Sequence, residues 1–246
     1  MTTLTVILPE TDPQATQRVT GESGAAALQH TPVLYLLHGL DGDDSVWTRR
    51  TLIERYASEK GLAVVMPKVG RSFYCDEHTG QKYWTFLTEE LPNMVARMFN
   101  VSTRREDTFV AGLSMGGYGA FKLALRHPQR FAAAASLSGA LNVAGSDSFD
   151  RLREEVPQVW GPHAPAGTHD DLISLLRTHT AESLPQLYQA CGTEDFLYQD
   201  NLTFAKEAQA RGINLYTDLE GPGNHDWMYW DTNIKKVLDW LPLAEQ

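Results

Sequence analysis

The stretch "TFVAGLSMGGYGAFKLAL", residues 108–125, decides the fold. Its first half is apolar and β-prone, and its second half has the spacing of a helix. Between the halves, Ser114 stands in the pattern Gly-x-Ser-x-Gly, with Gly112 two residues before it and Gly116 two residues after it. A chain that turns sharply from strand to helix leaves no room for side chains at those two positions. The stretch therefore predicts a strand, a tight turn that exposes Ser114, and a helix.

The rest of the chain alternates short apolar runs with amphipathic ones. The runs expected to be strands are 4–9, 33–38, 62–67, 108–114, 131–138, 186–192 and 214–221. Helical spacing is found at 47–60, 84–99, 115–126, 200–211 and 227–241. Several of the strands are almost continuously apolar, as in a parallel sheet that is covered on both faces. This alternation predicts an α/β fold with a mostly parallel central sheet and helices on both faces.

The domain organisation is expected to be simple. The 246 residues contain no internal repeat and no low-complexity linker, so residues 1–246 are interpreted as a single domain. Residues 10–31 are polar and are expected to form a surface loop. Residues 139–184 form a long excursion between two strands, with short helices expected at 149–156 and 170–178. This excursion is interpreted as cap-like, and it is where a wall over an active site is expected.

Charge and composition exclude several classes of function. The net charge is -10 and no cluster of Lys and Arg is longer than two, which argues against a nucleic-acid binder. No apolar run approaches the ~18 residues that a membrane span needs, and the first residues have no signal-peptide pattern. A cytoplasmic protein without a membrane partner is therefore expected. The two cysteines, Cys75 and Cys191, are far apart and do not suggest a disulfide scaffold.

The turn at Ser114 has a chemical interpretation and a structural one. As a structural feature, it is a glycine-rich turn whose serine caps a helix. As a chemical feature, it exposes a nucleophile at a helix N-terminus, where the backbone N–H of Met115 can stabilise an oxyanion. The second oxyanion donor is expected in the loop after the strand 33–38, at Leu40, with Gly39 as the next choice. We favour the nucleophile because both a strand and a helix flank the motif.

A serine nucleophile needs a base and an acid, which follow it in the order Asp or Glu, then His. Among the eight histidines, His225 alone lies beyond residue 179, in "GPGNHDW" after the last expected strand. The preceding strand is followed by "CGTEDFLYQD", in which Asp195 is our choice for the acid. The alternatives there are Glu194 and Asp200, of which Asp200 is expected to cap the helix 200–211. Asp226 adjoins the histidine and is poorly placed to orient its ring.

Two other features are interpreted as structural. His38 lies early in the chain and is expected to hold the loop at 38–42 rather than to act as a base. The acidic stretch "DGDD" at 41–44 resembles the start of a calcium loop, but the twelfth position is Leu52 instead of Glu. It is expected to cap the helix near Trp47, so the sequence predicts no metal site.

These motifs together resemble the esterase D-like branch of the α/β-hydrolases, which includes S-formylglutathione hydrolases and small bacterial tributyrin esterases. The segments that carry the resemblance are "LLHGLDGDDSVWTRR", "SFYCDEHTGQKYWTFLTEELP", "FVAGLSMGGYGAFKLAL", "AASLSGAL", "CGTEDFLYQDN" and "NHDWMYWD", between residues 33 and 231. The resemblance implies an α/β-hydrolase fold, a triad of Ser114, Asp195 and His225, and oxyanion donors at Leu40 and Met115. One departure is the strand that such proteins usually have before the one ending in "VILPE", which is missing here.

The expected function is a serine carboxylesterase that hydrolyses short acetyl or butyryl esters through a covalent acyl-enzyme, without metal or organic cofactor. Alternatives left open are an S-formylglutathione hydrolase, a feruloyl or acetyl-xylan esterase, and a binding module with a hydrolase fold. Gly39, Trp160 and Trp227 are candidate substrate-binding residues. The partner is expected to be a small ester, and a homo-oligomer is compatible with the missing edge strand.

Overall fold

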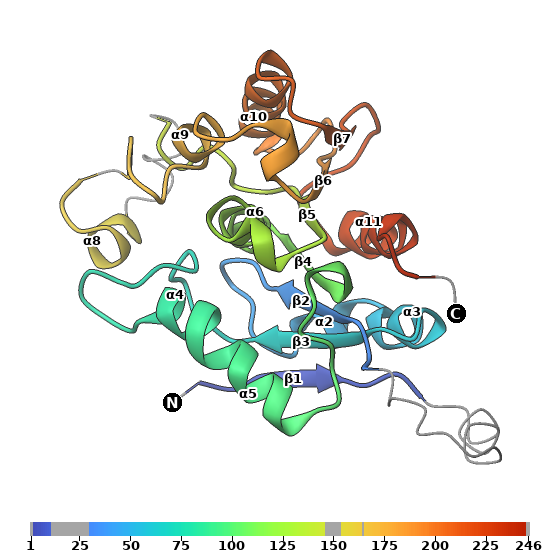
Figure 1. The fold of residues 1–246 in the computed structure, drawn as a ribbon. Helices are drawn as coiled ribbons and strands as arrows, with labels where there is room; N and C mark the ends of the chain where they lie inside the picture. Colours follow the sequence, from blue (N-terminus) through green and yellow to red (C-terminus); the bar gives the residue numbers. More distant parts are fainter. Residues whose placement is uncertain (1, 11–29, 146–153, 164, 245–246) are drawn as a thin grey trace, which may run out of the picture.

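The computed structural model describes residues 2–10, 30–145, 154–163 and 165–244, and its centre is a seven-stranded sheet (Figure 1). The strand order is β1-β3-β2-β4-β5-β6-β7, and every neighbouring pair is parallel except β1 with β3. The strands are β1 (Leu4–Ile7), β2 (Val33–Leu37), β3 (Ala63–Pro67), β4 (Thr108–Leu113), β5 (Ala133–Leu137), β6 (Gln186–Ala190) and β7 (Leu215–Asp218). All seven predicted strands are therefore confirmed, and β4 lies at the centre of the sheet.

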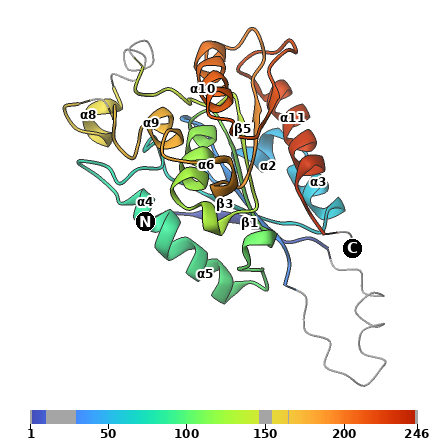
Figure 2. The same cartoon turned by 45° about the horizontal axis from the view of Figure 1, so that its top comes forward.

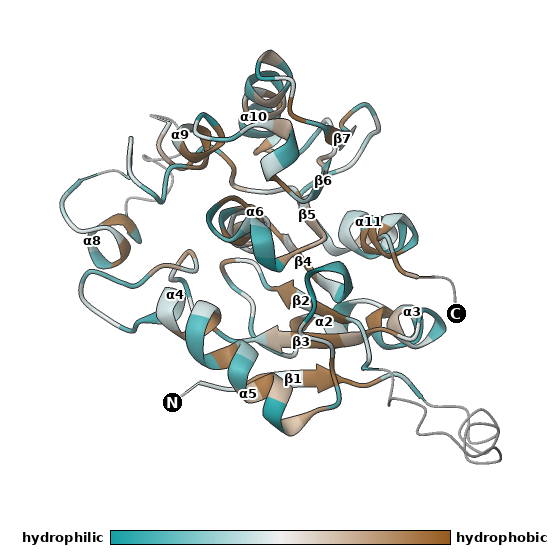
Figure 3. Cartoon of the chain, viewed as in Figure 1, coloured by the Kyte–Doolittle hydropathy of each residue, from teal (hydrophilic) through white to brown (hydrophobic). Residues whose placement is uncertain are grey.

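The central strands are buried on both faces, because helices cover each side of the sheet (Figure 2). Side chains alternate along a strand, so in β2 Tyr35 and Leu37 enter one apolar cluster while Leu34 and Leu36 enter the other. One face carries α5 (Leu91–Met98), α6 (Met115–Arg126), α9 (Leu172–Leu176) and α10 (Tyr198–Ala210); the other carries α2 (Val46–Arg50), α3 (Ile53–Glu59) and α11 (Trp227–Trp240). The brown colour of the inner strands in Figure 3 follows from this double burial.

The helix predicted at 47–60 is interrupted, which is a correction to the sequence analysis. Thr51 is extended (φ -137°, ψ 172°), so α2 ends before it and α3 begins after Leu52. The Thr51 hydroxyl accepts a hydrogen bond from the N–H of Ile53, and Asp231 of α11 accepts one from the N–H of Leu52. These side-chain acceptors satisfy the backbone at the break and tie it to α11.

The helix predicted at 84–99 is continuous but not uniform. It consists of α4 (Tyr83–Thr85), a π-helical turn η1 (Phe86–Glu90) and α5. Pro92 has no N–H to donate to the carbonyl of Thr88 four residues earlier. The guanidinium of Arg130 donates to that carbonyl instead, which compensates for the missing helical bond.

The excursion between β5 and β6 packs against α6. Its described helices are α8 (Val156–Val159), α9 and the 3₁₀ turn η4 (Ala181–Ser183); α9 confirms the helix predicted at 170–178, and the helix predicted at 149–156 lies largely outside the described residues. The loop predicted at 10–31 also lies almost wholly outside them. The hydroxyl of Tyr118 on α6 donates to the carbonyl of Asp170 at 2.8 Å, and the ring of Trp160 packs on Phe73 at 5.1 Å between ring centroids. The excursion therefore rests on the helix that follows Ser114.

Candidate active site

Ser114 occupies a strained turn between β4 and α6. Its backbone lies in the left-handed region (φ 54°, ψ -118°), which is unusual for a residue with a side chain. A Cβ at Gly112 would lie 2.3 Å from the carbonyl oxygen of Gly116, and one at Gly116 would lie 2.4 Å from that of Leu37. The turn is held by the N–H of Ser114, which donates to the carbonyl of Leu137 at 2.9 Å. The glycines thus permit the close packing that fixes the serine above the sheet.

His225 and Asp195 meet Ser114 at this edge of the sheet. The Nε2 atom of His225 lies 3.0 Å from the Ser114 hydroxyl, and its Nδ1 atom lies 2.8 and 3.0 Å from the two carboxylate oxygens of Asp195. A carboxylate can only accept hydrogen bonds, so Nδ1 carries the proton and Nε2 is an acceptor for the serine hydroxyl. The structure therefore brings together the three residues predicted from a chain order of Ser, Asp and His.

The loops that carry the acid and the histidine hold each other. Asp195 is buried, and its carboxylate also accepts from the N–H of Leu197 at 2.8 Å. The carboxylate of the neighbouring Glu194 accepts from the N–H of Gly223 on the loop that carries His225, whereas the Nδ1 atom of His225 is bonded to Asp195. A Cβ at Gly192 would lie 2.2 Å from the carbonyl oxygen of Gly223, so the two loops pack backbone to backbone. This contact positions His225 opposite Asp195.

The remaining acidic candidates have other positions. Helix α10 begins at Tyr198, so Asp200 is a buried residue of its first turn, and its predicted role as a cap is wrong. Asp226 is the N-cap of α11 and accepts from the N–H of Tyr229 at 3.0 Å. The ring of His225 is hydrogen-bonded to Asp195 and Ser114.

The loop that carries Leu40 lies beside the nucleophile. A Cβ at Gly39 would be 3.5 Å from the Cβ of Ser114 and 2.7 Å from the side chain of Leu113. Met115 is the first residue of α6, and the first N–H groups of a helix have no partner within the helix. Backbone N–H groups from the loop and from the helix start therefore come close to Ser114. Their use as oxyanion donors stays a prediction.

His38 is a structural residue of this loop, as predicted. Its Nε2 atom accepts from the N–H of Val69 at 3.1 Å, so Nδ1 carries the proton and donates to the carbonyl of Gly39 at 2.7 Å. Burial lowers the pKa of His38 below its ordinary value, despite the opposing effects of the Gly39 carbonyl and of Asp43 and Asp44. The imidazole is therefore neutral, and both of its nitrogens hold backbone groups.

The lowered pKa of His38 predicts a loss of stability in acid. Below its ordinary pKa of ~6.5, the unfolded chain binds a proton at His38 that the folded protein does not bind. The free energy of unfolding should then fall as the pH falls, by up to about 1.4 kcal/mol per pH unit for this group, until the folded pKa is passed. Urea unfolding of the wild type and of His38→Gln between pH 7 and 5 measures this. Equal slopes for the two proteins would contradict the assignment.

Tyr74 also supports the loop at 38–42, and no sequence pattern indicated this role. Phe73 and Tyr74 both have positive φ (51° and 54°) although neither is glycine. The strained turn buries the Tyr74 ring and directs its hydroxyl to the carbonyl of His38 at 2.8 Å. Arg71 adds a bridge from Asp41, which follows Leu40, to Glu155 in the excursion. The loop is thus held from two sides.

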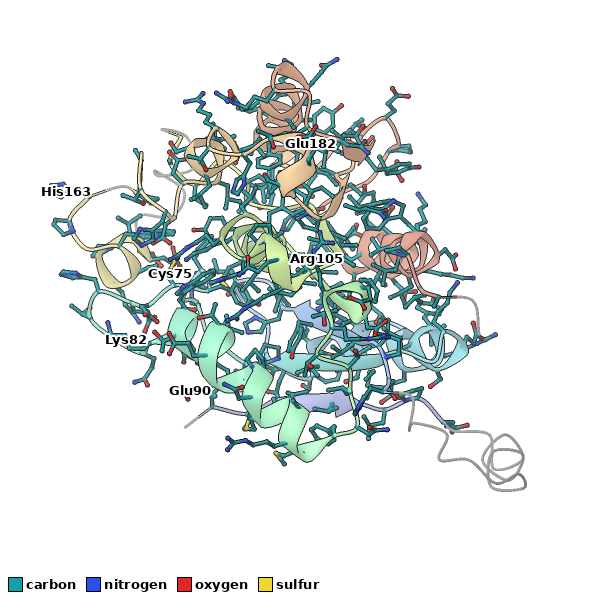
Figure 4. All side chains as sticks on the ribbon, in the orientation of Figure 1. Cys75, Lys82, Glu90, Arg105, His163 and Glu182 are labelled. Carbon is teal, nitrogen blue, oxygen red and sulfur yellow. The ribbon has the colours of Figure 1, made fainter. Side chains whose placement is uncertain are left out.

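A buried ion pair joins α6 to the excursion. Lys122 is 1% exposed, and its ammonium lies 2.6 Å from the carboxylate of Asp170, 3.0 Å from the sulfur of Cys75 and 3.2 Å from the carbonyl of Tyr74. Burial alone would raise the pKa of Asp170, but the neighbouring cations Lys122, His169 and Arg126 together hold it below its ordinary value. Burial raises the pKa of the Cys75 thiol to about 11, so this residue, labelled in Figure 4, is a neutral thiol in the interior.

Removing the charge of Lys122 should therefore be costly. Lys122→Met keeps most of the side-chain volume but leaves the carboxylate of Asp170 (15% exposed) without its cation. We expect a loss of about 3 kcal/mol in the free energy of unfolding, measured in urea. Lys236→Met, which breaks an exposed pair with Asp218, should cost about 1 kcal/mol or less. Similar losses of unfolding free energy in the two variants would contradict the prediction that the buried pair stabilises the fold more than the exposed pair does.

Two further aromatic rings flank the imidazole of His225, and neither was predicted to do so. The Phe196 ring lies at 4.5 Å and the Trp230 ring, edge-on, at 4.9 Å between ring centroids. Trp227, a predicted substrate-binding residue, packs on Trp47 and Trp230, and its contact with a substrate stays a prediction. Trp160, which belongs to the excursion, packs on Phe73, and its contact with a substrate stays a prediction. The sequence contains no pattern from which the positions of Phe196 and Trp230 beside His225 could be predicted.

This architecture defines the class of the protein. A mostly parallel sheet with helices on both faces, and a serine exposed at a Gly-x-Ser-x-Gly turn after the central strand, are the marks of an α/β-hydrolase. A family model described as "Putative esterase" matches residues 23–241, and the chain belongs to this esterase family. The expected fold class and the resemblance to esterase D-like proteins are both confirmed.

Known proteins agree with this assignment. An acetyl esterase of Caldicellulosiruptor saccharolyticus is 30% identical, over 98% of this chain and 92% of its own. The structure of a fluorophosphonate-binding serine hydrolase F of Staphylococcus aureus is similar with a TM-score of 0.86, and that of an S-formylglutathione hydrolase of the same organism with 0.81. Each is 36% identical and covers 98% of this chain and 92% of its own. The chain is thus a carboxylic ester hydrolase of the serine type. Within the described residues, no helix is long and apolar enough to cross a membrane.

Proposed function

We propose that Ser114 is the nucleophile, His225 the general base and Asp195 the residue that orients the imidazole. The observation that carries the proposal is the unbroken series of contacts from Asp195 through His225 to the Ser114 hydroxyl, at 2.8 and 3.0 Å. A serine hydroxyl becomes an effective nucleophile only when an adjacent base removes its proton. Asp195 would keep the proton on Nδ1 and stabilise the imidazolium that forms.

The reaction then proceeds in two halves. Ser114 attacks the ester carbonyl, and the N–H groups of Leu40 and Met115 bind the oxyanion, each contributing roughly 3 kcal/mol to transition-state stabilisation. His225 passes the serine proton to the leaving alcohol, which departs and leaves an acyl-serine ester. Water, activated by the same imidazole, hydrolyses that ester and restores Ser114. These proton transfers and N–H donors suffice for the cycle, so it needs no metal ion or organic cofactor.

Short acyl esters are the substrates that we propose. The acetyl esterase that matches almost the whole chain supports this choice. Hydrolysis of p-nitrophenyl acetate, butyrate and octanoate tests it, and kcat/KM should fall from the short esters to octanoate. A preference for octanoate would contradict the proposal.

Thioester hydrolysis is the second candidate, favoured by the S-formylglutathione hydrolase at 36% identity. The chemistry at Ser114 would be the same, and only the groups around the substrate would differ. Turnover of S-formylglutathione against p-nitrophenyl acetate separates the two candidates. A fluorophosphonate probe would label either enzyme at Ser114 but would not label a binding module that lacks an activated serine.

A further inference from the structure

Phe196 is a large apolar side chain at the surface, directly beside His225. It is 59% exposed, and its ring lies 4.5 Å from the imidazole, whereas Trp230 on another side of the imidazole is buried. The imidazole is thus backed by one buried aromatic ring and flanked by one exposed ring. The exposed ring is the one that a molecule entering from solvent can touch.

The proposed reaction fixes which part of a substrate would touch it, and the present inference rests on that function. In the acylation step, Nε2 of His225 gives its proton to the leaving oxygen, which must then be within hydrogen-bond reach of Nε2. The group attached to the leaving oxygen therefore lies on the histidine side of Ser114, next to Phe196. An aromatic face favours flat apolar groups and cations.

The negative charge around Phe196 gives a second reason to expect a preference among leaving groups. The segments 191–205 and 212–234, which supply Asp195 and His225, contain no Lys or Arg. Glu194 and Asp226, each adjacent in sequence to one of these two residues, are exposed. The carboxylate of Glu194 is bonded to the N–H of Gly223, which places it on the loop that carries His225. A leaving group on this side enters a negative potential.

We propose that Phe196, Glu194 and Asp226 form a leaving-group subsite that accepts neutral or cationic aromatic alcohols and disfavours anionic leaving groups. Glutathione, with two carboxylates and one ammonium, belongs to the disfavoured class. The acyl group would have little part in this selection, because its carbonyl oxygen points to the N–H groups of Leu40 and Met115.

Three acetates with one acyl group test the charge preference: phenyl acetate, 4-(trimethylammonio)phenyl acetate and 4-acetoxybenzoate. Each kcat/KM is divided by the rate constant for hydrolysis by hydroxide, which removes differences in intrinsic reactivity. The cationic ester should exceed the anionic one about tenfold at about 20 mM NaCl, and the ratio should approach one at about 1 M NaCl, where charges are screened. A ratio of one at low salt would overturn the proposal.

Charge variants assign the preference to named residues. Glu194→Gln keeps an oxygen for the N–H of Gly223, and Asp226→Asn keeps one for the N–H of Tyr229. The double variant should reduce the ratio of cationic to anionic ester about fivefold at low salt. Glu90→Gln is the matched control, because Glu90 is exposed on η1, across the sheet from α11, as Figure 4 shows. An unchanged ratio in the double variant would overturn the role of these carboxylates.

Phe196→Ala tests the aromatic contact, with ethyl acetate as a substrate whose alcohol is too small to reach the ring. If Phe196 binds the leaving group, kcat/KM for phenyl acetate should fall about tenfold more than that for ethyl acetate. If the ring only steadies His225, both values should fall equally, and the proposal would be overturned. Met98→Ala, which removes another exposed apolar side chain (67% exposed), should leave both values unchanged.

A thioester pair extends the test to the second candidate function. N-acetyl-S-acetylcysteamine is neutral and S-acetylglutathione is anionic, and the proposal requires the neutral one to be hydrolysed faster. Faster hydrolysis of the glutathione thioester would overturn it. Failure of folded wild type to hydrolyse any of these compounds would instead overturn the proposed function itself, so the two failures are distinguishable.

Discussion

Ser114→Ala is expected to lower kcat/KM for p-nitrophenyl acetate by at least about 10⁴-fold. The variant removes the atom that forms the acyl-enzyme and leaves the Leu40 and Met115 N–H groups in place. Alanine has the same restriction as serine at φ 54°, so the strain of the turn does not change. The free energy of unfolding should stay within about 0.5 kcal/mol of wild type, measured in urea.

Labelling by a fluorophosphonate provides the independent measurement. Wild type should incorporate one probe, at Ser114, and Ser114→Ala should incorporate none. Ser138→Ala is a weaker comparison because Ser138 is buried and accepts from the indole of Trp230; Ser58→Ala, on α3, is the better control and should label like wild type. Ester turnover near the wild-type rate in Ser114→Ala would refute the nucleophile assignment.

Asp195→Asn is expected to lower kcat about 10⁴-fold. The amide can present its NH₂ group to Nδ1 of His225, which moves the imidazole proton to Nε2. That nitrogen then donates to Ser114 and can no longer accept its proton. Because the amide oxygen can still accept from the N–H of Leu197, the loop should keep its geometry and KM should change little.

An Asp-to-Asn substitution far from the active site distinguishes the loss of histidine orientation in Asp195→Asn from the mere loss of a negative charge. Asp239→Asn removes an exposed carboxylate that pairs with Lys60, the C-cap residue of α3, and it should leave kcat unchanged. A kcat for Asp195→Asn within tenfold of wild type would mean that another group orients the histidine. Pre-steady-state measurement of p-nitrophenol release should show a slower acylation step, since this step needs the base first.

Much of the fold could be predicted from the sequence because it depends on local pattern. Continuous apolar runs marked the parallel strands, and Gly112 and Gly116 marked the turn at Ser114. The break at Thr51 could not be predicted, because it depends on Asp231, a residue 180 positions away in sequence from Thr51 that accepts from the next N–H. Helical spacing continues across the break, so the pattern alone indicated one helix.

The positions of Ser114, Asp195 and His225 were predictable for a different reason. Parallel strands end at the same edge of a sheet, so residues that follow β4, β6 and β7 are brought together by topology. No comparable rule of topology predicts the residues that support the site, such as Tyr74 and Lys122. Tyr74 adopts positive φ without being glycine, and Lys122 interrupts an apolar helix face to meet Asp170, which lies in a different segment of the chain, just before α9. Their partners are defined only by tertiary packing.

The ion pair of Lys122 and Asp170 constrains how this enzyme can be re-engineered or diversify. Replacing the excursion with one that lacks an acidic residue at position 170 would leave an ammonium without its carboxylate on α6, the helix that begins beside the nucleophile. A graft that also replaces Lys122 by an apolar side chain would avoid this cost. A chimaera should therefore exchange the excursion together with residue 122, or neither of them.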